Sequence, residues 1–141
     1  MMSLGVYIRK VQYHETDKMG ITHHSNYVKW MEEARIDFLD QLGYGYARLE
    51  QEGVSSPVTG IEGRYKRPTT FGDTVSIQVR VEEFKGVRLT IHYLMTNLET
   101  EETVFEGTSQ HCFVNHEGKP VILKKQVPAF AQLLQELVEA E

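Results

Sequence analysis

Two stretches of alternating apolar and polar residues, one on either side of Lys85-Gly86, constrain this chain more than any other feature. The first stretch runs over residues 73–84 and the second over residues 87–95. Successive side chains of a strand point to opposite faces, so each stretch gathers its apolar residues on one face. A Lys-Gly pair between two such stretches is a turn signal. The sequence therefore predicts a long antiparallel hairpin with one apolar face, which another element must cover.

The segment before this hairpin predicts a long helix that can cover it. Apolar residues recur there at helical spacing: Tyr27, Trp30, Met31, Ala34, Phe38 and Leu42. Ser25 and Asn26 are good N-cap residues, and Gly43 is expected to end the helix. Val28, Ile36 and Leu39 add apolar groups away from this stripe, so we expect the helix to be buried on most sides. Trp30 and Met31 are expected in the core or in the lining of a substrate pocket.

Three more strands and a second helix complete the predicted fold. Strands are expected over residues 4–13, 58–67 and 103–115, the first of them covered on both faces. Pro128 begins a short amphipathic helix that carries Phe130, Leu133, Leu134 and Leu137. The prediction is a single α+β domain over residues 1–141, in which a curved antiparallel sheet of five or six strands wraps one long helix.

Composition narrows the classes of protein that fit. The single cysteine, Cys112, excludes an intrachain disulfide, and its place in a strand pattern favours a core residue over a nucleophile. Neither a signal peptide nor a membrane span is recognisable, so we expect a cytoplasmic protein with no membrane partner. The net charge of −5 argues against nucleic acid as a partner.

A polar segment links the first strand to the long helix and carries the candidate chemistry. It reads His14-Glu15-Thr16-Asp17-Lys18-Met19-Gly20 and is predicted to form a loop. An aspartate in front of a helix most often braces the loop or caps the helix. The first turn of a helix also offers unpaired N–H groups and a positive dipole end, both of which favour negative charge. The residues alone leave both readings of Asp17 open.

The residues from Tyr13 to Tyr27, followed by Trp30 and by Glu32-Glu33-Ala34-Arg35, resemble the 4-hydroxybenzoyl-CoA thioesterase-like family. The closer likeness is to its branch of acyl-CoA thioesterases associated with the Tol-Pal system. Tyr65-Lys66-Arg67-Pro68, with Gly72-Asp73 after it, is a second match. The resemblance implies a hotdog fold, hydrolysis of acyl-CoA, no cofactor and no metal. It also implies a homodimer with the active site at the subunit interface, or a homotetramer built from two such dimers.

The same resemblance assigns roles around the loop. Thioester hydrolysis needs a carboxylate that attacks the carbonyl or deprotonates water, and N–H donors where the oxyanion develops. Asp17 matches the family's catalytic aspartate, and His24, seven residues later, matches the helix-start residue whose backbone N–H polarises the carbonyl. The side chains of His24 and Tyr13 match residues that assist in the Tol-Pal-associated branch.

Substrate contacts are expected from two groups of residues. The first is the start of the helix, at Ser25, Asn26 and Tyr27. The second is a set of cations for the CoA phosphates, at Arg64, Lys66, Arg67, Lys85 and Arg88. Lys85 lies at the hairpin turn, where the family has a basic residue. Solvated surface charge is the ordinary alternative for each of these cations.

Several alternatives stay open at this stage. Glu32 or Glu33 would be the principal carboxylate if the chain followed another hotdog lineage, which uses a glutamate on the central helix. His14, His23 and His24 with Asp17 suggest a metal site, but their spacing fits no standard zinc pattern. A hotdog hydratase or dehydratase acting on acyl thioesters and a non-catalytic acyl-CoA-binding protein are the rival functions. Met19 replaces the family's usual small residue, which bears on the acyl group that fits.

Overall fold

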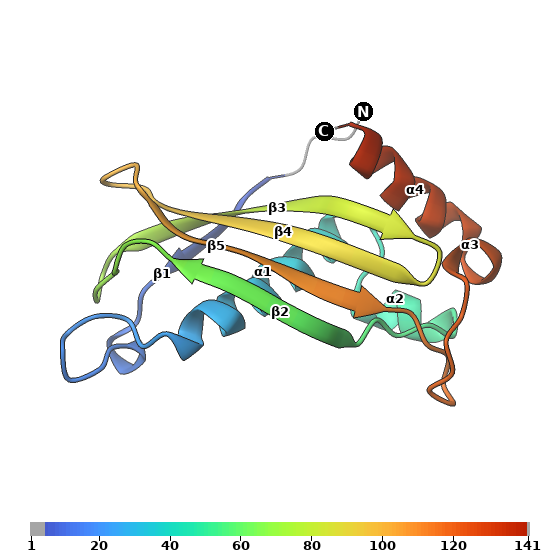
Figure 1. Cartoon of the computed structure of the whole chain (residues 1–141), viewed down its shortest axis with the longest axis horizontal. Coiled ribbons are helices and arrows are strands. Elements are labelled where there is room, and N and C mark those ends of the chain that lie inside the picture. Colours follow the sequence, from blue (N-terminus) through green and yellow to red (C-terminus); the bar gives the residue numbers. More distant parts are fainter. Residues whose placement is uncertain (1–4, 141) are drawn as a thin grey trace.

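The computed structural model describes residues 5–140, whose five strands form one antiparallel sheet (Figure 1). The strands are β1 (Tyr7–Lys10), β2 (Val58–Tyr65), β3 (Thr74–Lys85), β4 (Arg88–Asn97) and β5 (Thr103–Cys112). Their order across the sheet is β1-β3-β4-β5-β2, so β1 and β2 are the two edges. The long helix α1 (Ser25–Gln41) lies along one face of the sheet. This confirms the predicted α+β arrangement of a five-stranded sheet around one helix.

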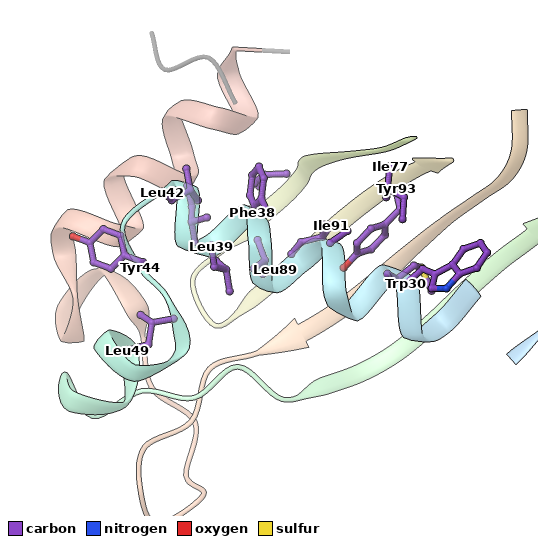
Figure 2. Close-up of a cluster of buried hydrophobic side chains, with 14 of the residues drawn as sticks. Trp30, Phe38, Leu39, Leu42, Tyr44, Leu49, Ile77, Leu89, Ile91 and Tyr93 are labelled. Atoms are coloured by element: carbon purple, nitrogen blue, oxygen red, sulfur yellow. The ribbon is translucent and has the colours of Figure 1, made fainter. Parts of the chain in front are cut away.

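The hairpin that dominates the sequence forms the centre of the sheet. Lys85 pairs with Arg88 at its turn, where Gly86 has a positive φ of 57°. The alternation fixes which side chains face α1, because those of the second strand are buried at Leu89, Ile91, Tyr93 and Met95. Figure 2 shows this face of the hairpin packed against α1 residues that include Trp30 and Phe38. The hydrophobic core therefore lies between the hairpin and the helix.

Helix α1 ends as predicted, but its N-cap residue lies one position before the predicted cap residues. Gly43 has a positive φ of 82°, and the Tyr44 N–H returns to the Leu39 carbonyl at 3.0 Å, which is a Schellman-type ending. At the other end the N-cap residue is His24, so neither Ser25 nor Asn26 caps the helix. Both belong to the first turn of α1.

The prediction that α1 is buried on most sides is wrong for the single chain. Val28 and Ile36 are exposed, because the sheet covers only one side of the helix and ends at β2. Val58, Ile61 and Tyr65 of that edge strand are exposed as well. We call these five residues the β2–α1 face.

Three short helices close the sheet at the end away from the start of α1 (Figure 1). They are α2 (Tyr46–Gln51), α3 (Leu123–Gln126) and α4 (Pro128–Glu139). The Tyr44 and Phe130 rings stack there with centroids 4.6 Å apart. Pro128 starts α4 as predicted, whereas α2 and α3 are too short to show a period in the sequence. None of the helices within residues 5–140 has the length and apolar character needed to cross a membrane.

The remaining differences from prediction concern where strands end. β1 covers Tyr7–Lys10 instead of residues 4–13, and Leu4 lies outside the described residues. Ile8 is half exposed, so β1 is not covered on both faces. A short 3-10 helix, η1 (Tyr13–Glu15), follows it. Cys112 is only partly buried, because alternation along β5 turns it away from the core that holds His111.

Candidate active site

A hollow of about 370 Å³ lies at the start of α1. Three segments form it: the Asp17 loop, the first turn of the helix, and the stretch that follows β2. Its lining comprises Asp17, Met19, Ile21, Thr22, His24, Tyr27, Tyr65, Lys66, Arg67 and Pro68. The fold thus brings together two parts of the sequence that are about 40 residues apart.

Asp17 sits in a closed loop that uses only part of its carboxylate. The Asp17 N–H donates to the Ile21 carbonyl at 2.9 Å, and Asp17 Oδ1 accepts the Met19 N–H at 2.8 Å. Gly20 closes the loop with a positive φ of 81°. Among residues 5–140, no hydrogen bond or ion pair reaches Asp17 Oδ2. One carboxylate oxygen therefore shapes the loop, and the other has no partner within residues 5–140.

The start of α1 lines the same hollow and carries a backbone N–H without an acceptor in residues 5–140. As the N-cap residue, His24 lies where backbone N–H groups lack intrahelical partners. Its N–H meets no acceptor within the part of the chain that the structure describes. Its carbonyl accepts the Tyr65 hydroxyl at 3.0 Å, and its ring stacks on His23 with centroids 4.2 Å apart. Tyr65, on β2, thus ties the helix start to the sheet.

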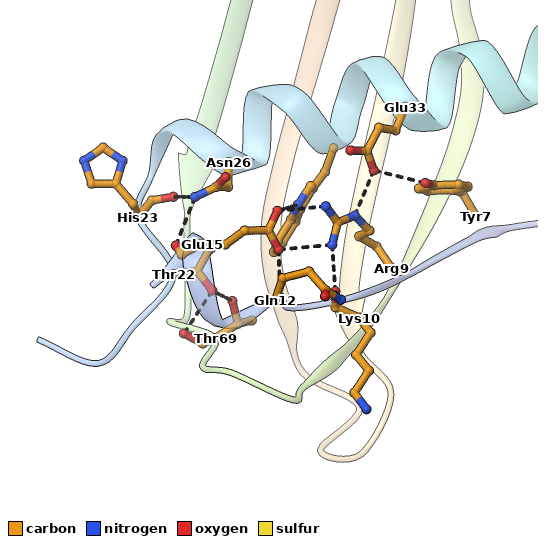
Figure 3. A network of polar contacts seen from close by, with 11 residues as sticks. Tyr7, Arg9, Lys10, Gln12, Glu15, Thr22, His23, Asn26, Glu33 and Thr69 are labelled. Carbon is orange, nitrogen blue, oxygen red and sulfur yellow. Dashed lines mark hydrogen bonds and ion pairs between the residues drawn. The ribbon is translucent and has the colours of Figure 1, made fainter. Parts of the chain in front are cut away.

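A buried hydroxyl cluster joins the Asp17 loop to the segment after β2. The Thr22 N–H donates to the Thr69 carbonyl at 2.8 Å, and the two threonine hydroxyls are 2.6 Å apart. The Tyr27 hydroxyl lies 2.9 Å from Thr69 Oγ1, and burial raises the pKa of Tyr27. Figure 3 shows Thr22 and Thr69 side by side. These threonines and Tyr65 were not predicted as site residues, because their positions depend on contacts between distant segments.

Two predicted substrate contacts at the helix start serve the protein itself. The Asn26 side chain is buried and donates to the carbonyls of Glu15 at 3.0 Å and His23 at 3.1 Å (Figure 3). The Ser25 hydroxyl lies 2.8 Å from His23 Nδ1. Of the three helix residues predicted to contact substrate, only Tyr27 lines the hollow.

Four further predicted residues lie outside the hollow of the single chain. Tyr13 is 76% exposed, and its ring packs edge-on against Phe71. Arg64 lies beside a separate shallow depression with Glu62 and His92. Lys85 and Arg88 flank the turn between β3 and β4, at the opposite end of the sheet (Figure 1).

Lys66 and Arg67 supply positive charge at the rim. Lys66 Nζ is 3.3 Å from Glu106 Oε1, and Arg67 Nε is 3.4 Å from Glu102 Oε2. The hydrogen bond from His92, followed by that from Lys66, lowers the pKa of Glu106. Exposed pairs of this kind are worth about 0–1 kcal/mol, so a phosphate can replace the carboxylate at little cost.

A metal site and a helix glutamate are the alternative chemistries, and Glu32 lines a second, larger hollow along α1. Residues 5–140 hold no group of three or more His, Cys, Asp or Glu placed to bind a metal ion. Glu32 pairs with Arg35, and Glu33 accepts hydrogen bonds from Tyr7 and Arg9. Neither glutamate lines the hollow that holds Asp17.

A larger hollow of about 460 Å³ lies farther along α1. Its walls are mostly apolar and include Ile36, Leu39, Leu49, Val54 and Val58. It adjoins the β2–α1 face, at the end of β2 away from Tyr65.

Residues 11–137 match the sequence model of a family described as the thioesterase-like superfamily. The chain belongs to this family. It is 37% identical over 120 residues, 84% of this chain and 86% of the other, to YneP of Bacillus subtilis, a candidate acyl-CoA thioesterase. It is 28% identical over 90 residues, 64% of this chain and 67% of the other, to the acyl-CoA thioester hydrolase YbgC of Escherichia coli O157:H7.

The likeness extends to solved structures. A DHNA-CoA thioesterase from Staphylococcus aureus superposes with a TM-score of 0.87 and 31% identity, covering 96% of this chain and 91% of that one. The hotdog fold is therefore confirmed, and the family and its relatives identify the protein as a thioester hydrolase.

Proposed function

We propose that the protein hydrolyses acyl-CoA thioesters in the hollow that holds Asp17. One observation carries this proposal: Asp17 and His24 line the same hollow, and within residues 5–140 one Asp17 carboxylate oxygen and the His24 backbone N–H have no hydrogen-bond partner. The oxygen is Oδ2 of Asp17, and the N–H is that of His24. A thioester carbonyl between them meets a nucleophile or base on one side and an oxyanion donor on the other.

In this mechanism Asp17 either attacks the carbonyl carbon or takes a proton from an attacking water. The carbonyl oxygen gains negative charge, which the His24 N–H stabilises by a hydrogen bond. When this intermediate collapses the C–S bond breaks, and the CoA thiolate leaves and takes up a proton, from Asp17 in the water route and from solvent in the nucleophilic route. In the nucleophilic route a water then cleaves the Asp17–acyl anhydride and frees the acid. One well-placed oxyanion donor is worth about 2.7–4 kcal/mol, whereas a helix dipole contributes roughly 0.3–1 kcal/mol. Donor geometry therefore dominates. The His24 ring and Tyr13 have supporting roles at the mouth of the site.

The CoA phosphates are proposed to bind at Lys66 and Arg67, which already lie at the rim. Lys85 and Arg88 lie at the opposite end of the sheet, and Arg64 borders a separate depression whose Glu106 also pairs with Lys66. A second copy of the chain would change this.

We propose a homodimer that forms through the β2 edge. Among the described residues 5–140, β2 pairs only with β5, so its outer edge has backbone groups that can pair with another strand. The exposed apolar residues of the β2–α1 face flank this edge. A two-fold axis would pair β2 with its own copy in antiparallel register and bury both faces.

Such a pairing brings the Tyr65 end of one copy next to the Val58 end of the other. The Asp17 hollow then lies near the larger apolar hollow of the other copy, which we propose takes the acyl group. It also moves Lys85 and Arg88 toward the site from across the interface. These residues would then join Lys66 and Arg67 at the CoA phosphates.

The decisive experiment is Asp17→Asn, which keeps the side-chain shape and removes the charge. We expect kcat for acyl-CoA hydrolysis, followed by release of free thiol, to fall at least about 10³-fold. Thermal stability and acyl-CoA binding should be nearly unchanged. Asp37→Asn, on α1 away from the hollow, is the matched control. Turnover that survives the loss of the Asp17 charge would remove the assignment.

Thiol release also separates the rival functions. A hydratase would change the absorbance of an enoyl thioester without releasing thiol, and a non-catalytic protein would bind acyl-CoA without turnover. The finer likeness to the Tol-Pal-associated branch is tested by a substrate panel. It should span aliphatic chain lengths, include one benzoyl thioester, and compare CoA with acyl carrier protein.

The proposed dimer is tested at the two edges of the sheet. Ile61→Glu places charge on the β2 edge, and we expect monomers in sedimentation together with a loss of turnover. Ile8→Glu on the β1 edge is the control and should leave the assembly intact. If both variants sediment like the wild type, the β2 interface is wrong.

A further inference from the structure

A buried carboxylate lies directly beneath the Asp17 loop. The Glu15 side chain is 3% exposed and accepts four hydrogen bonds (Figure 3). Oε1 accepts from Arg9 Nη1 at 3.0 Å and from the Gln12 N–H at 2.8 Å. Oε2 accepts from Arg9 Nη2 at 2.8 Å and from Trp30 Nε1 at 3.0 Å. Glu15 with these three partners is called the Glu15 clamp below.

The Glu15 clamp stabilises the ionised form of the Glu15 carboxyl group. Burial alone would raise the pKa of Glu15, but the hydrogen bonds from Gln12, Trp30 and Arg9 outweigh it and lower the pKa. Arg9 also donates to Glu33 Oε1 at 2.9 Å, so the guanidinium joins the Asp17 loop to α1. A buried charge held this way fixes its surroundings, because any displacement breaks charged hydrogen bonds away from water.

The backbone of Glu15 ties the two ends of the Asp17 loop together. Its carbonyl accepts the His23 N–H at 2.8 Å and the Asn26 side chain at 3.0 Å. Asp17 follows Glu15 by two residues, and His24 follows His23 by one. Asp17 therefore lies two residues from Glu15, and His24 follows directly the residue that the Glu15 carbonyl binds.

We propose that Glu15 is a positioning residue, whose clamp holds the Asp17 loop against the start of α1 so that the Asp17 carboxylate reaches the carbonyl polarised by His24. This inference rests on the proposed function. Glu15 does not line the hollow, so it acts through Asp17 and not on the substrate. The clamp also explains why the chain buries a carboxylate and an arginine where an apolar pair would cost less to desolvate.

Glu15→Gln tests the proposal with almost no change of volume. The amide NH₂ must face an N–H donor of Arg9, Trp30 or Gln12, so one contact becomes repulsive. We expect kcat to fall by roughly 10- to 100-fold, because a misplacement of about 1 Å at a reacting group can cost 10²-fold. KM should stay within about twofold, because Lys66 and Arg67 lie on another segment.

Glu33→Gln is the matched control. It removes the other carboxylate that binds Arg9, on the helix instead of the loop, and should change kcat by less than about twofold. An equal loss in both variants would assign the effect to Arg9 in general and overturn the specific role of Glu15. If Glu15→Gln does not fold, Arg9→Lys replaces it, since lysine keeps the charge and loses the two-pronged contact. Wild-type kcat in the variant that folds would overturn the proposal.

A double-variant cycle separates positioning from a merely structural role. In the Asp17→Asn background, Glu15→Gln should lower the residual turnover by less than about threefold, because the group it positions is already disabled. If Glu15→Gln lowers turnover by the same factor in the wild-type and the Asp17→Asn backgrounds, Glu15 only supports folding. The two proposals also fail differently. Full turnover in Asp17→Asn removes the proposed function, whereas loss there with none in Glu15→Gln removes only the positioning role.

Discussion

The two ends of the sheet are built from different kinds of contact. At the loop end, which comprises residues 12–24, residues 65–73 and the first turn of α1, the segments are joined largely by hydrogen bonds and the Arg9–Glu15 ion pair, with aromatic contacts such as Tyr27–Tyr65 beside them. At the α4 end, which comprises α2, α3, α4 and the turn between β3 and β4, the buried contacts are largely apolar and aromatic, and side-chain hydrogen bonds such as that from Gln126 to the Glu52 carbonyl are exposed. Figures 2 and 3 show examples of the two kinds.

The difference indicates how the fold divides its tasks. Directional hydrogen bonds fix the Asp17 loop against the start of α1, and the proposed catalysis would require such precise placement. Apolar packing at the other end is not directional, but it buries large areas and supplies stability. Changes at the α4 end should therefore act on the free energy of unfolding, and changes at the loop end on turnover.

The largest effect is expected from Phe130→Ala at the α4 end. Phe130 is 1% exposed and stacks on Tyr44, so its loss leaves a cavity and should lower the free energy of unfolding by about 3–5 kcal/mol. Urea denaturation measures this. Turnover per folded molecule should stay at the wild-type value. Phe71→Ala, an exposed phenylalanine of the loop end, should cost less than about 0.5 kcal/mol. If both substitutions lowered the free energy of unfolding equally, the proposed difference between the loop end and the α4 end would be wrong.

The next largest effect is a loss of stability at acid pH, which we expect from the buried His111. Its Nε2 lies 2.7 Å from Ser109 Oγ, and burial lowers the pKa of His111 to about 4 from its ordinary value of 6.5. Between these values the unfolded chain binds a proton that the folded chain does not. Stability should therefore be complete above pH 6.5 and fall toward pH 4, by an amount on the order of 3 kcal/mol.

His111→Gln removes this titration, so its free energy of unfolding should vary less with pH over that window. Urea denaturation between pH 6.5 and 5 is the cleanest measurement, since Glu15 titrates at lower pH. An acid slope that is the same in both proteins would show that His111 does not carry it.

The smallest effect is expected from Tyr65→Phe at the loop end. It removes one hydrogen bond to the His24 carbonyl and leaves the aromatic packing on Tyr27 and Phe105. A net hydrogen bond is worth about 1 kcal/mol, so we expect kcat to fall roughly fivefold. The midpoint of thermal unfolding should hardly move. A large loss of stability without loss of turnover would contradict this prediction, because it is the result that we expect for residues of the α4 end.

The sequence predicted the parts of this protein that depend on local pattern. The alternation on either side of Lys85-Gly86 specifies the hairpin, and Gly43 specifies the end of α1, because period and turn chemistry are read over a few residues. Residues 13–27 pointed to Asp17 and His24, and the hollow does hold both. The partial exposure of Cys112 and of one side of α1 was missed, since exposure depends on where the sheet ends.

By itself, therefore, the sequence determined the strands, the two longer helices α1 and α4, the family and the loop that carries the candidate carboxylate. Only the tertiary structure decided that Glu15 is buried under that loop, that Thr69 and Tyr65 brace it from 40 or more residues away, and that Lys85 and Arg88 lie at the far end. The physical reason is that hydrogen bonds and burial between distant segments depend on how the sheet curves around α1, which no local period encodes.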